Sequence, residues 1–328
     1  MKDLSNGKCN CKYFDMKRLI LLLLLFTGWV HVNAVEKDSL LVMFWNVENF
    51  FDWIDQGTGD SDAEFSSYGG KHWTKSKFYA KCDAIAKAVM WVGDKYGRMP
   101  DVIGLAEVEN RGVLTKMLSS TLLRKFDYGI VHKDSEDRRG IDVALLYRRG
   151  SMNLVSSTFV TSDSLRTRDI LHAELSHSDG SGIDFIVNHH PSKYGGAEES
   201  AQKRMQVMNS LKSLCDSLVA RGGNTVVAMG DFNDTPDAEQ FSVLEGLLDN
   251  KGLPLHQDGK GSIRYKGRWE LIDFFLTRGV EDSRMEVLEI PFLMTYDRSY
   301  PGYRPLRTYS GPRYLGGVSD HCPILLWI

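Results

Sequence analysis

The chain has 328 residues, with 40 basic and 43 acidic side chains and a formal net charge of −3. This near balance excludes a protein whose whole surface attracts polyanions without specificity. The length suits one large domain or two small ones. No Pro-, Ser- or Gly-rich linker, repeat or low-complexity tract follows residue 34. We therefore predict a single domain over residues 35–328.

The N-terminal segment has the pattern of a secretory leader. Basic Lys17 and Arg18 precede the apolar run 19–26, and Val32-Asn33-Ala34 gives the small-x-small ending of a signal peptide. A membrane span needs about 18–20 apolar residues, so an anchor is the weaker interpretation. We predict a signal peptide over residues 1–34, with Met16 as an alternative start. The mature protein is then exported, either to the periplasm or to the medium.

The predicted mature chain is mildly acidic and has few cysteines. Without residues 1–34 it holds 35 basic and 41 acidic residues, a net charge of about −6. Its three cysteines, Cys82, Cys215 and Cys322, are an odd number at wide spacing. This pattern indicates neither a disulfide framework nor a zinc site. We expect all three to be core residues.

Apolar patterning predicts many strands and few helices. Apolar residues at steps of three and four predict helices over 75–96, after residue 110, and from 198 through 220. Apolar runs predict strands over 39–45, 101–106, 128–131, 141–147, 154–160, 170–175, 183–187, 225–229, 269–277 and 323–327. Residues 55–70 are predicted to be a loop, and 291–314 to be irregular. Strands must then connect mainly to strands, which favours a mixed α/β or α+β fold with two packed sheets.

Polar side chains stand at the ends of several predicted strands. The run Thr225–Met229 breaks at Gly230 into Asp231, Phe232 and Asn233. Similar positions hold Asn46, Glu48, Glu107, His189, His190, Asp273, Asp320 and His321. Taken singly, these are ordinary turn, cap or surface residues. Asp273 is the exception, because a carboxylate in such an apolar strand needs a partner. Together, oxygen ligands with few imidazoles suit Mg²⁺, Mn²⁺ or Ca²⁺ and hydrolysis of a phosphate ester.

Six segments carry these residues in a familiar order. They are Asn46-Val47-Glu48, Ala106-Glu107-Val108, Asn188-His189-His190-Pro191-Ser192, Gly230-Asp231-Phe232-Asn233, Ile272-Asp273-Phe274 and Ser319-Asp320-His321-Cys322-Pro323. In this order the chain resembles the endonuclease/exonuclease/phosphatase family from Leu41 to Ile328. The resemblance implies a metal-dependent phosphoric ester hydrolase. It also implies a four-layer α-β-β-α sandwich with two central mixed sheets and the site at one sheet edge.

The resemblance also implies a role for each matched residue. Glu107 would be the principal ligand of Mg²⁺, or of Mn²⁺ or Ca²⁺. Asn46, Glu48 and Asp320 would lie close to the ion. Asp231 and Asn233 would orient the attacking water and a phosphate oxygen, and His321, held by Asp273, would contact the scissile phosphate.

Four further residues are assigned with alternatives left open. His189 matches the second histidine of the family pattern, but the following His190 departs from that pattern and leaves either histidine as the one that contacts substrate. We hypothesise that Asp142 supports His189, as Asp273 supports His321. Arg139 contacts phosphate or is a solvated turn residue, and the sequence favours neither.

The reaction class is better determined than the substrate. The leading hypothesis is an exported nuclease that cleaves DNA or RNA, because the Asn-Val-Glu-Asn-Phe-Phe-Asp opening is similar to that of bacterial extracellular nucleases of the family. Interleaved Arg and Tyr residues over 296–314 would suit nucleic acid, although an ordinary loop is slightly favoured. The alternative is a phosphatase or phospholipase C acting on sugar phosphates, inositol phosphates or phospholipid head groups. An inactive binding module is disfavoured, and no protein partner is predicted for this expected monomer.

Overall fold

The structure is a computed structural model that describes residues 39–162, 165–177, 179–193, 196–222 and 225–328. The chain divides into two units between residues 39 and 40, and the second, Leu40–Ile328, is described below. The predicted signal peptide lies outside the described residues. Within the described ranges, no helix combines the length and the apolar composition that crossing a membrane requires.

Two six-stranded mixed sheets form the centre of the second unit. The first has the order β13-β18-β1-β2-β4-β3, and the second has the order β5-β6-β7-β8-β12-β9. Strands β1–β2 and β7–β8 pair in parallel, and the other pairs are antiparallel. The first sheet comprises β1 (Leu41–Phe50), β2 (Val102–Val108), β3 (Tyr128–His132), β4 (Asp142–Arg148), β13 (Arg284–Val287) and β18 (Ile324–Trp327). The second comprises β5 (Met152–Val160), β6 (Ile170–His177), β7 (Gly182–His189), β8 (Val226–Asp231), β9 (Asp249–Asn250) and β12 (Asp273–Arg278).

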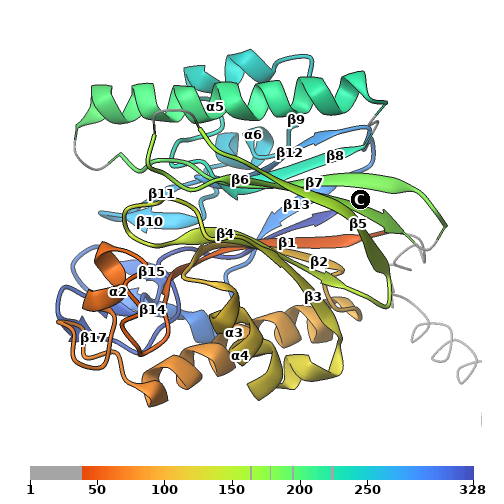
Figure 1. Cartoon of the computed structure of the whole chain (residues 1–328). Coiled ribbons are helices and arrows are strands. Elements are labelled where there is room, and N and C mark those ends of the chain that lie inside the picture. Colours follow the sequence, from red (N-terminus) through yellow and green to blue (C-terminus); the bar gives the residue numbers. More distant parts are fainter. Residues whose placement is uncertain (1–38, 163–164, 178, 194–195, 223–224) are drawn as a thin grey trace, which may run out of the picture. The chain divides into compact units, whose positions relative to one another are not determined.

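Helices cover the outer faces of both sheets. Helices α3 (Lys75–Tyr96) and α4 (Arg111–Ser120) pack on the first sheet, and α5 (Ala197–Ala220) packs on the second (Figure 1). Along β1, Val42 and Phe44 belong to the cluster that includes the second sheet, whereas Leu41 and Met43 belong to the cluster of α3 and α4. This alternation follows from the two faces of a strand. The predicted four-layer sandwich is confirmed.

Two regions differ from the sequence prediction. Residues 269–277 form two strands, β11 (Arg268–Glu270) and β12, because β11 pairs with β10 (Ile263–Tyr265) before the chain enters the second sheet. Residues 291–314 are not irregular, since they form two hairpins whose strands of two to four residues are too short to give a pattern. These strands are β14 (Met294–Asp297), β15 (Gly302–Pro305), β16 (Tyr309–Ser310) and β17 (Arg313–Tyr314).

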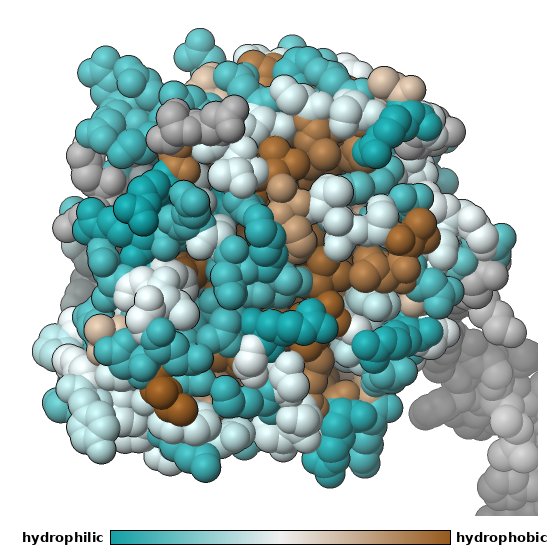
Figure 2. All heavy atoms as spheres, in the orientation of Figure 1, coloured by the Kyte–Doolittle hydropathy of each residue, from teal (hydrophilic) through white to brown (hydrophobic). Residues whose placement is uncertain are grey.

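Short elements fill the remaining connections. They are α2 (Asp60–Glu64), η1 (Leu122–Lys125), η2 (Glu239–Leu244), α6 (Leu253–Gln257) and η3 (Pro291–Leu293). The cysteines Cys82, Cys215 and Cys322 are buried free thiols, as predicted. Figure 2 shows apolar atoms at the surface along the middle of one face, between the layers formed by α5 and by α3 and α4. The edge strand β5 contributes exposed Leu154 and Val155 to the surface.

Candidate active site

The predicted site residues converge where the two sheets end. Strands β1, β2, β7 and β8 end at this edge, and β12 and β18 begin near it. The register pairs Asp231 with both Asp273 and His189. Across the sandwich, the amide Nδ2 of Asn46 donates to Oδ2 of Asp231 at 2.9 Å. This bond joins the first sheet to the second.

Asp231 is the centre of this group. Its Oδ2 lies 3.6 Å from Nε2 of His189 and 3.8 Å from Nε2 of His321. Its Oδ1 accepts the backbone N–H of Asn233 at 2.9 Å. Burial, and then the charge of Asp273, raises the pKa of Asp231 to about 7. A carboxyl with this pKa can take up a proton near neutral pH, as a general base must.

The backbone around Asp231 has features that few sequences allow. A Cβ on Gly230 would come 2.4 Å from the carbonyl oxygen of Asn188, so only glycine permits this approach of β8 to β7. Glu48, Glu107 and Asn233 have φ angles of 48°, 63° and 52°. Non-glycine residues rarely adopt positive φ angles, and backbone strain of this kind is found preferentially at functional sites.

Of the two histidines beside Asp231, one is charged and the other is neutral. Nδ1–H of His321 donates to Oδ2 of Asp273 at 2.7 Å, which is the contact predicted from the sequence. Burial opposes charge on His321, but Asp273 and Asp231 outweigh it and raise its pKa well above the ordinary value. Burial, and then the charge of Arg168, lowers the pKa of His189 well below it. His321 is therefore an imidazolium at pH 7, and His189 is neutral.

The predicted metal-binding carboxylates each meet an arginine. Arg307 donates from Nη2 to Oε1 of Glu48 at 2.9 Å and lies 3.0 Å from Oδ2 of Asp320. Arg139 lies 3.3 Å from Oε2 of Glu107 and donates to Oδ1 of Asn49 at 2.7 Å. Arg139 is therefore placed against the site and is not a solvated turn residue.

These residues fit a hard divalent cation. Burial, and then the charge of Asp320, raises the pKa of Glu48 to about 7, so two carboxylates crowd each other where a cation would relieve the repulsion. Burial also opposes the charge of Glu107, but Arg139, the backbone N–H of Asn49 and the charge of His321 together outweigh it and hold the pKa of Glu107 below its usual value. The donors of Asn46, Glu48, Glu107 and Asp320 are oxygens, which Mg²⁺, Mn²⁺ and Ca²⁺ prefer.

The hypothesis that Asp142 supports His189 is wrong. Among the described residues, Nδ1 of His189 has no hydrogen-bond partner. Asp142 accepts instead from the backbone N–H of Ser135 at 3.1 Å and from the Ser135 hydroxyl, and its Oδ2 lies 3.9 Å from Nε2 of His132. Asp142 begins β4 and faces its neighbour β3, because β4 stands between β2 and β3 in the sheet.

His190 does not contact substrate with its side chain. Its ring is fully buried and packs edge-on against Phe232, with ring centroids 5.1 Å apart. Successive strand residues point to opposite faces, so His190 points away from the side on which His189 meets Asp231. Its carbonyl oxygen still contributes, since it accepts Nδ2 of Asn233 at 2.9 Å.

Three cationic residues at the site were not assigned from the sequence. Arg168 joins the loop before β4 to the end of β7, because it donates to Oδ2 of Asp137 at 3.1 Å and to the carbonyl of His190 at 2.8 Å. Lys81 of α3 is buried and donates to the carbonyl of Glu48 and to the Thr308 hydroxyl. Lys81 follows Phe78 by three residues, a spacing that could have placed it on the buried face of the helix. No sequence signal marked the contacts of Arg168 or Arg307.

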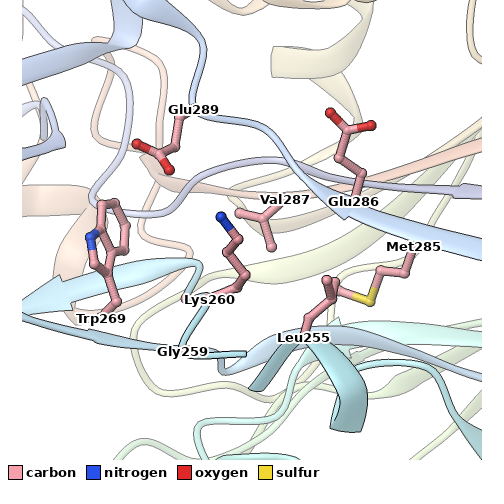
Figure 3. A pocket seen from close by; sticks show the side chains of 9 residues that line it. Leu255, Gly259, Lys260, Trp269, Met285, Glu286, Val287 and Glu289 are labelled. Carbon is pink, nitrogen blue, oxygen red and sulfur yellow. The ribbon is translucent and has the colours of Figure 1, made fainter. Parts of the chain in front are cut away.

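A separate pocket of about 310 Å³ lies beside β13. Figure 3 shows Lys260 and Trp269 on one side of it and Glu286 and Glu289 on the other. None of the six motif segments contributes to its lining. The chemistry of the chain is therefore placed at the strand ends and not in this pocket.

The comparisons with known proteins agree with this geometry. The model of the Endonuclease/Exonuclease/phosphatase family matches residues 41–328. The chain belongs to this family. Its members are divalent-metal-dependent hydrolases, and this chain is a phosphoric ester hydrolase. Comparison with curated proteins gives no match.

Several solved structures share the fold. D. rerio TDP2 complexed with single strand DNA product is 13% identical, with a TM-score of 0.55 over 88% of this chain and 98% of that chain. A mannosyl-6-phosphatase of Bacteroides thetaiotaomicron is 16% identical, with a TM-score of 0.56 over 88% and 99%. The human Nocturnin catalytic domain with bound sulfate is 17% identical, with a TM-score of 0.55 over 88% and 92%. At these identities the likeness shows the fold.

Proposed function

We propose that this protein is an exported phosphodiesterase that hydrolyses single-stranded nucleic acid, DNA or RNA. The observation that carries the proposal is a surface of four exposed tyrosines, which we call the tyrosine surface: Tyr265, Tyr296, Tyr300 and Tyr303, with exposed fractions of 43–63%. Exposed aromatic rings beside cationic groups stack unpaired bases, at about 1–3 kcal/mol per base.

The tyrosine surface adjoins the catalytic residues through the backbone. Ile263 of β10 bridges to His321, and Arg264 donates to the carbonyls of Tyr300 and Pro301. Figure 1 shows β10, β11, β14 and β15 gathered near one end of the sandwich. Arg307, which follows β15, contacts Glu48 and Asp320. A strand stacked on these rings would thus bring its phosphates towards Arg307.

The charge states derived above assign the roles in hydrolysis. The oxygen of a water attacks phosphorus, its proton passes to the carboxylate of Asp231, and the bond from phosphorus to the leaving oxygen breaks. The leaving oxygen then takes a proton from solvent water, and Asp231 releases its own to solvent. Asn46 and the N–H of Asn233 hold that carboxylate in place. His321, charged through Asp273, donates to a phosphoryl oxygen and offsets its growing charge. A bound divalent ion near Glu107 would offset the same charge.

Substrate choice tests the proposal. Purified protein with Mg²⁺, Mn²⁺ or Ca²⁺ is offered single-stranded DNA, RNA, sphingomyelin, inositol phosphates, mannose 6-phosphate and an aryl phosphate. Tyr296→Ala with Tyr303→Ala should raise KM for oligonucleotides about tenfold or more, since each stacked base contributes about 1–3 kcal/mol, and should leave the aryl phosphate unaffected. The control is Leu122→Ala, an equally exposed apolar residue in η1, beyond the opposite end of the first sheet. Turnover of lipid or sugar phosphates without nucleic acid would refute the proposal.

A phosphatase is the second candidate. Arg139 and Arg307 flank the carboxylates from two sides, and two guanidinium groups suit the higher charge of a terminal phosphate monoester. The same substrate panel decides between the candidates. Export is tested separately, by N-terminal sequencing of protein recovered outside the cytoplasm, which should begin near Val35.

A further inference from the structure

One histidine and two aspartates form a cluster beside the catalytic edge. His132 ends β3, Asp142 begins β4, and Asp134 lies in the loop that joins these strands. Each offers one ligand atom, and the three atoms lie within 4.8 Å of one another. In the sheet order β1-β2-β4-β3, the cluster lies beyond Glu107 of β2. It is therefore distinct from the group of Asp231 and His321.

The histidine of the cluster has a buried, unpartnered atom that points towards Asp142. The side chain of His132 is 1% exposed, and its Nε2 has no hydrogen-bond partner in the part of the chain that the structure describes. Facing Nε2 at 3.9 Å is Oδ2 of Asp142, whose other oxygen already accepts from Ser135. Such an unpaired buried atom costs about 1–3 kcal/mol. A group that filled this gap would stabilise the fold.

We propose that His132, Asp134 and Asp142 bind a divalent transition-metal ion of the zinc type, separate from the catalytic ion. One imidazole nitrogen with two carboxylate oxygens suits Zn²⁺, whereas Mg²⁺ and Ca²⁺ prefer oxygen ligands alone. Tetrahedral ligands at zinc lie about 3.3 Å apart, so the observed 3.9 Å between Nε2 and Oδ2 requires only a small closure. Oδ1 of Asp134 lies 3.7 Å from the other ring nitrogen of His132, Nδ1, and the Asp134 side chain is 73% exposed, so it reaches an ion at Nε2 by rotation.

The proposed ion would fix the base of a loop that serves catalysis. The loop between β3 and β4 carries Asp137 and Arg139. The carboxylate of Asp137 accepts a hydrogen bond from Arg168, and Arg139 contacts Glu107. Both ends of the loop are attached to proposed ligands, His132 before it and Asp142 after it. The ion would therefore hold Arg139 against the site without touching substrate.

Counting bound zinc tests this site without measuring turnover. The full chain is freed of metal with a chelator and dialysed against Zn²⁺, and zinc per chain is measured by elemental analysis and calorimetry. The wild type should bind one more ion than His132→Ala. The matched control is His256→Ala, which removes a histidine 3.2 Å from a carboxylate oxygen of Asp237 and should leave the count unchanged.

A second variant keeps the test decisive if His132→Ala does not fold. Asp134→Asn changes an exposed side chain and should preserve the fold. It should lower zinc affinity at this site by at least about tenfold, since even partners outside the ligand shell change metal affinity by roughly 10–100-fold. Equal zinc counts in the wild type and His132→Ala, or unchanged affinity in Asp134→Asn, would overturn the proposal.

Discussion

Replacing Asp273 by asparagine removes the charge that keeps His321 protonated, while the size of the side chain stays the same. Nδ1 of His321 and Oδ2 of Asp273 are 2.7 Å apart, and both side chains are nearly buried, at 10% and 1% exposure. Without this carboxylate, the largest opposing influence on the pKa of His321 is burial, which favours the neutral ring. We therefore expect Asp273→Asn to convert His321 towards neutral imidazole at pH 7.

The size of the effect depends on what happens to the proton. Leaving a charge buried and unpaired costs about 3–5 kcal/mol, but an imidazole can release its proton. The loss of stability is then limited to a charged hydrogen bond, about 1.5–3 kcal/mol. Turnover should fall more sharply, by roughly 10²–10³-fold, because the imidazolium is the hydrogen-bond donor that offsets the growing charge on the phosphoryl oxygen.

Urea unfolding at several pH values, together with steady-state kinetics, measures both effects. The folded pKa of His321 is raised above its unfolded value, so the stability due to the pair is fully present below about pH 6.5 and is lost as pH rises through the folded pKa. The difference between wild type and Asp273→Asn should shrink accordingly at high pH. The control is Asp237→Asn beside His256, a more exposed pair at 3.2 Å, which should change stability by less than about 0.5 kcal/mol. Unchanged turnover with an unchanged pH dependence would refute this account of the dyad.

Three other predictions concern the base, a buried arginine and the ion. Asp231→Asn should abolish turnover but raise the free energy of unfolding above pH 7, because the raised pKa of about 7 means that ionisation of Asp231 destabilises the fold. Kinetics measures the first effect and urea denaturation the second. Retained turnover would contradict the role of Asp231 as base. Arg168→Met should lower stability by about 1.5–3 kcal/mol through its bonds to Asp137 and His190, with partial rescue in Arg168→Lys, and an unchanged melting temperature would contradict this. Exhaustive chelation should stop phosphate-ester hydrolysis and added Mg²⁺ should restore it, whereas turnover that survives chelation would remove the ion from the mechanism.

Much of the fold followed from local pattern. The spacing of Phe78, Cys82 and Ile85 predicted α3, and the apolar run before Gly230 predicted β8, because the periods of helix and strand are set by the backbone alone. The polar residues at the strand ends were visible for the same reason. Predicting that they meet at one edge required the family resemblance, because the local periodicity of a sequence does not indicate which strands are neighbours in a sheet.

Contacts between distant segments were decided only by the tertiary structure. Arg307 meets Glu48 across 259 positions of sequence. Asp142 faces His132 and not His189, because sheet order and not motif order determines its neighbour. The sequence by itself determined the periodicities, the motif residues and hence the reaction class. The partners and protonation states of those residues depend on burial and on charges brought together by packing, which a short-range sequence pattern does not predict.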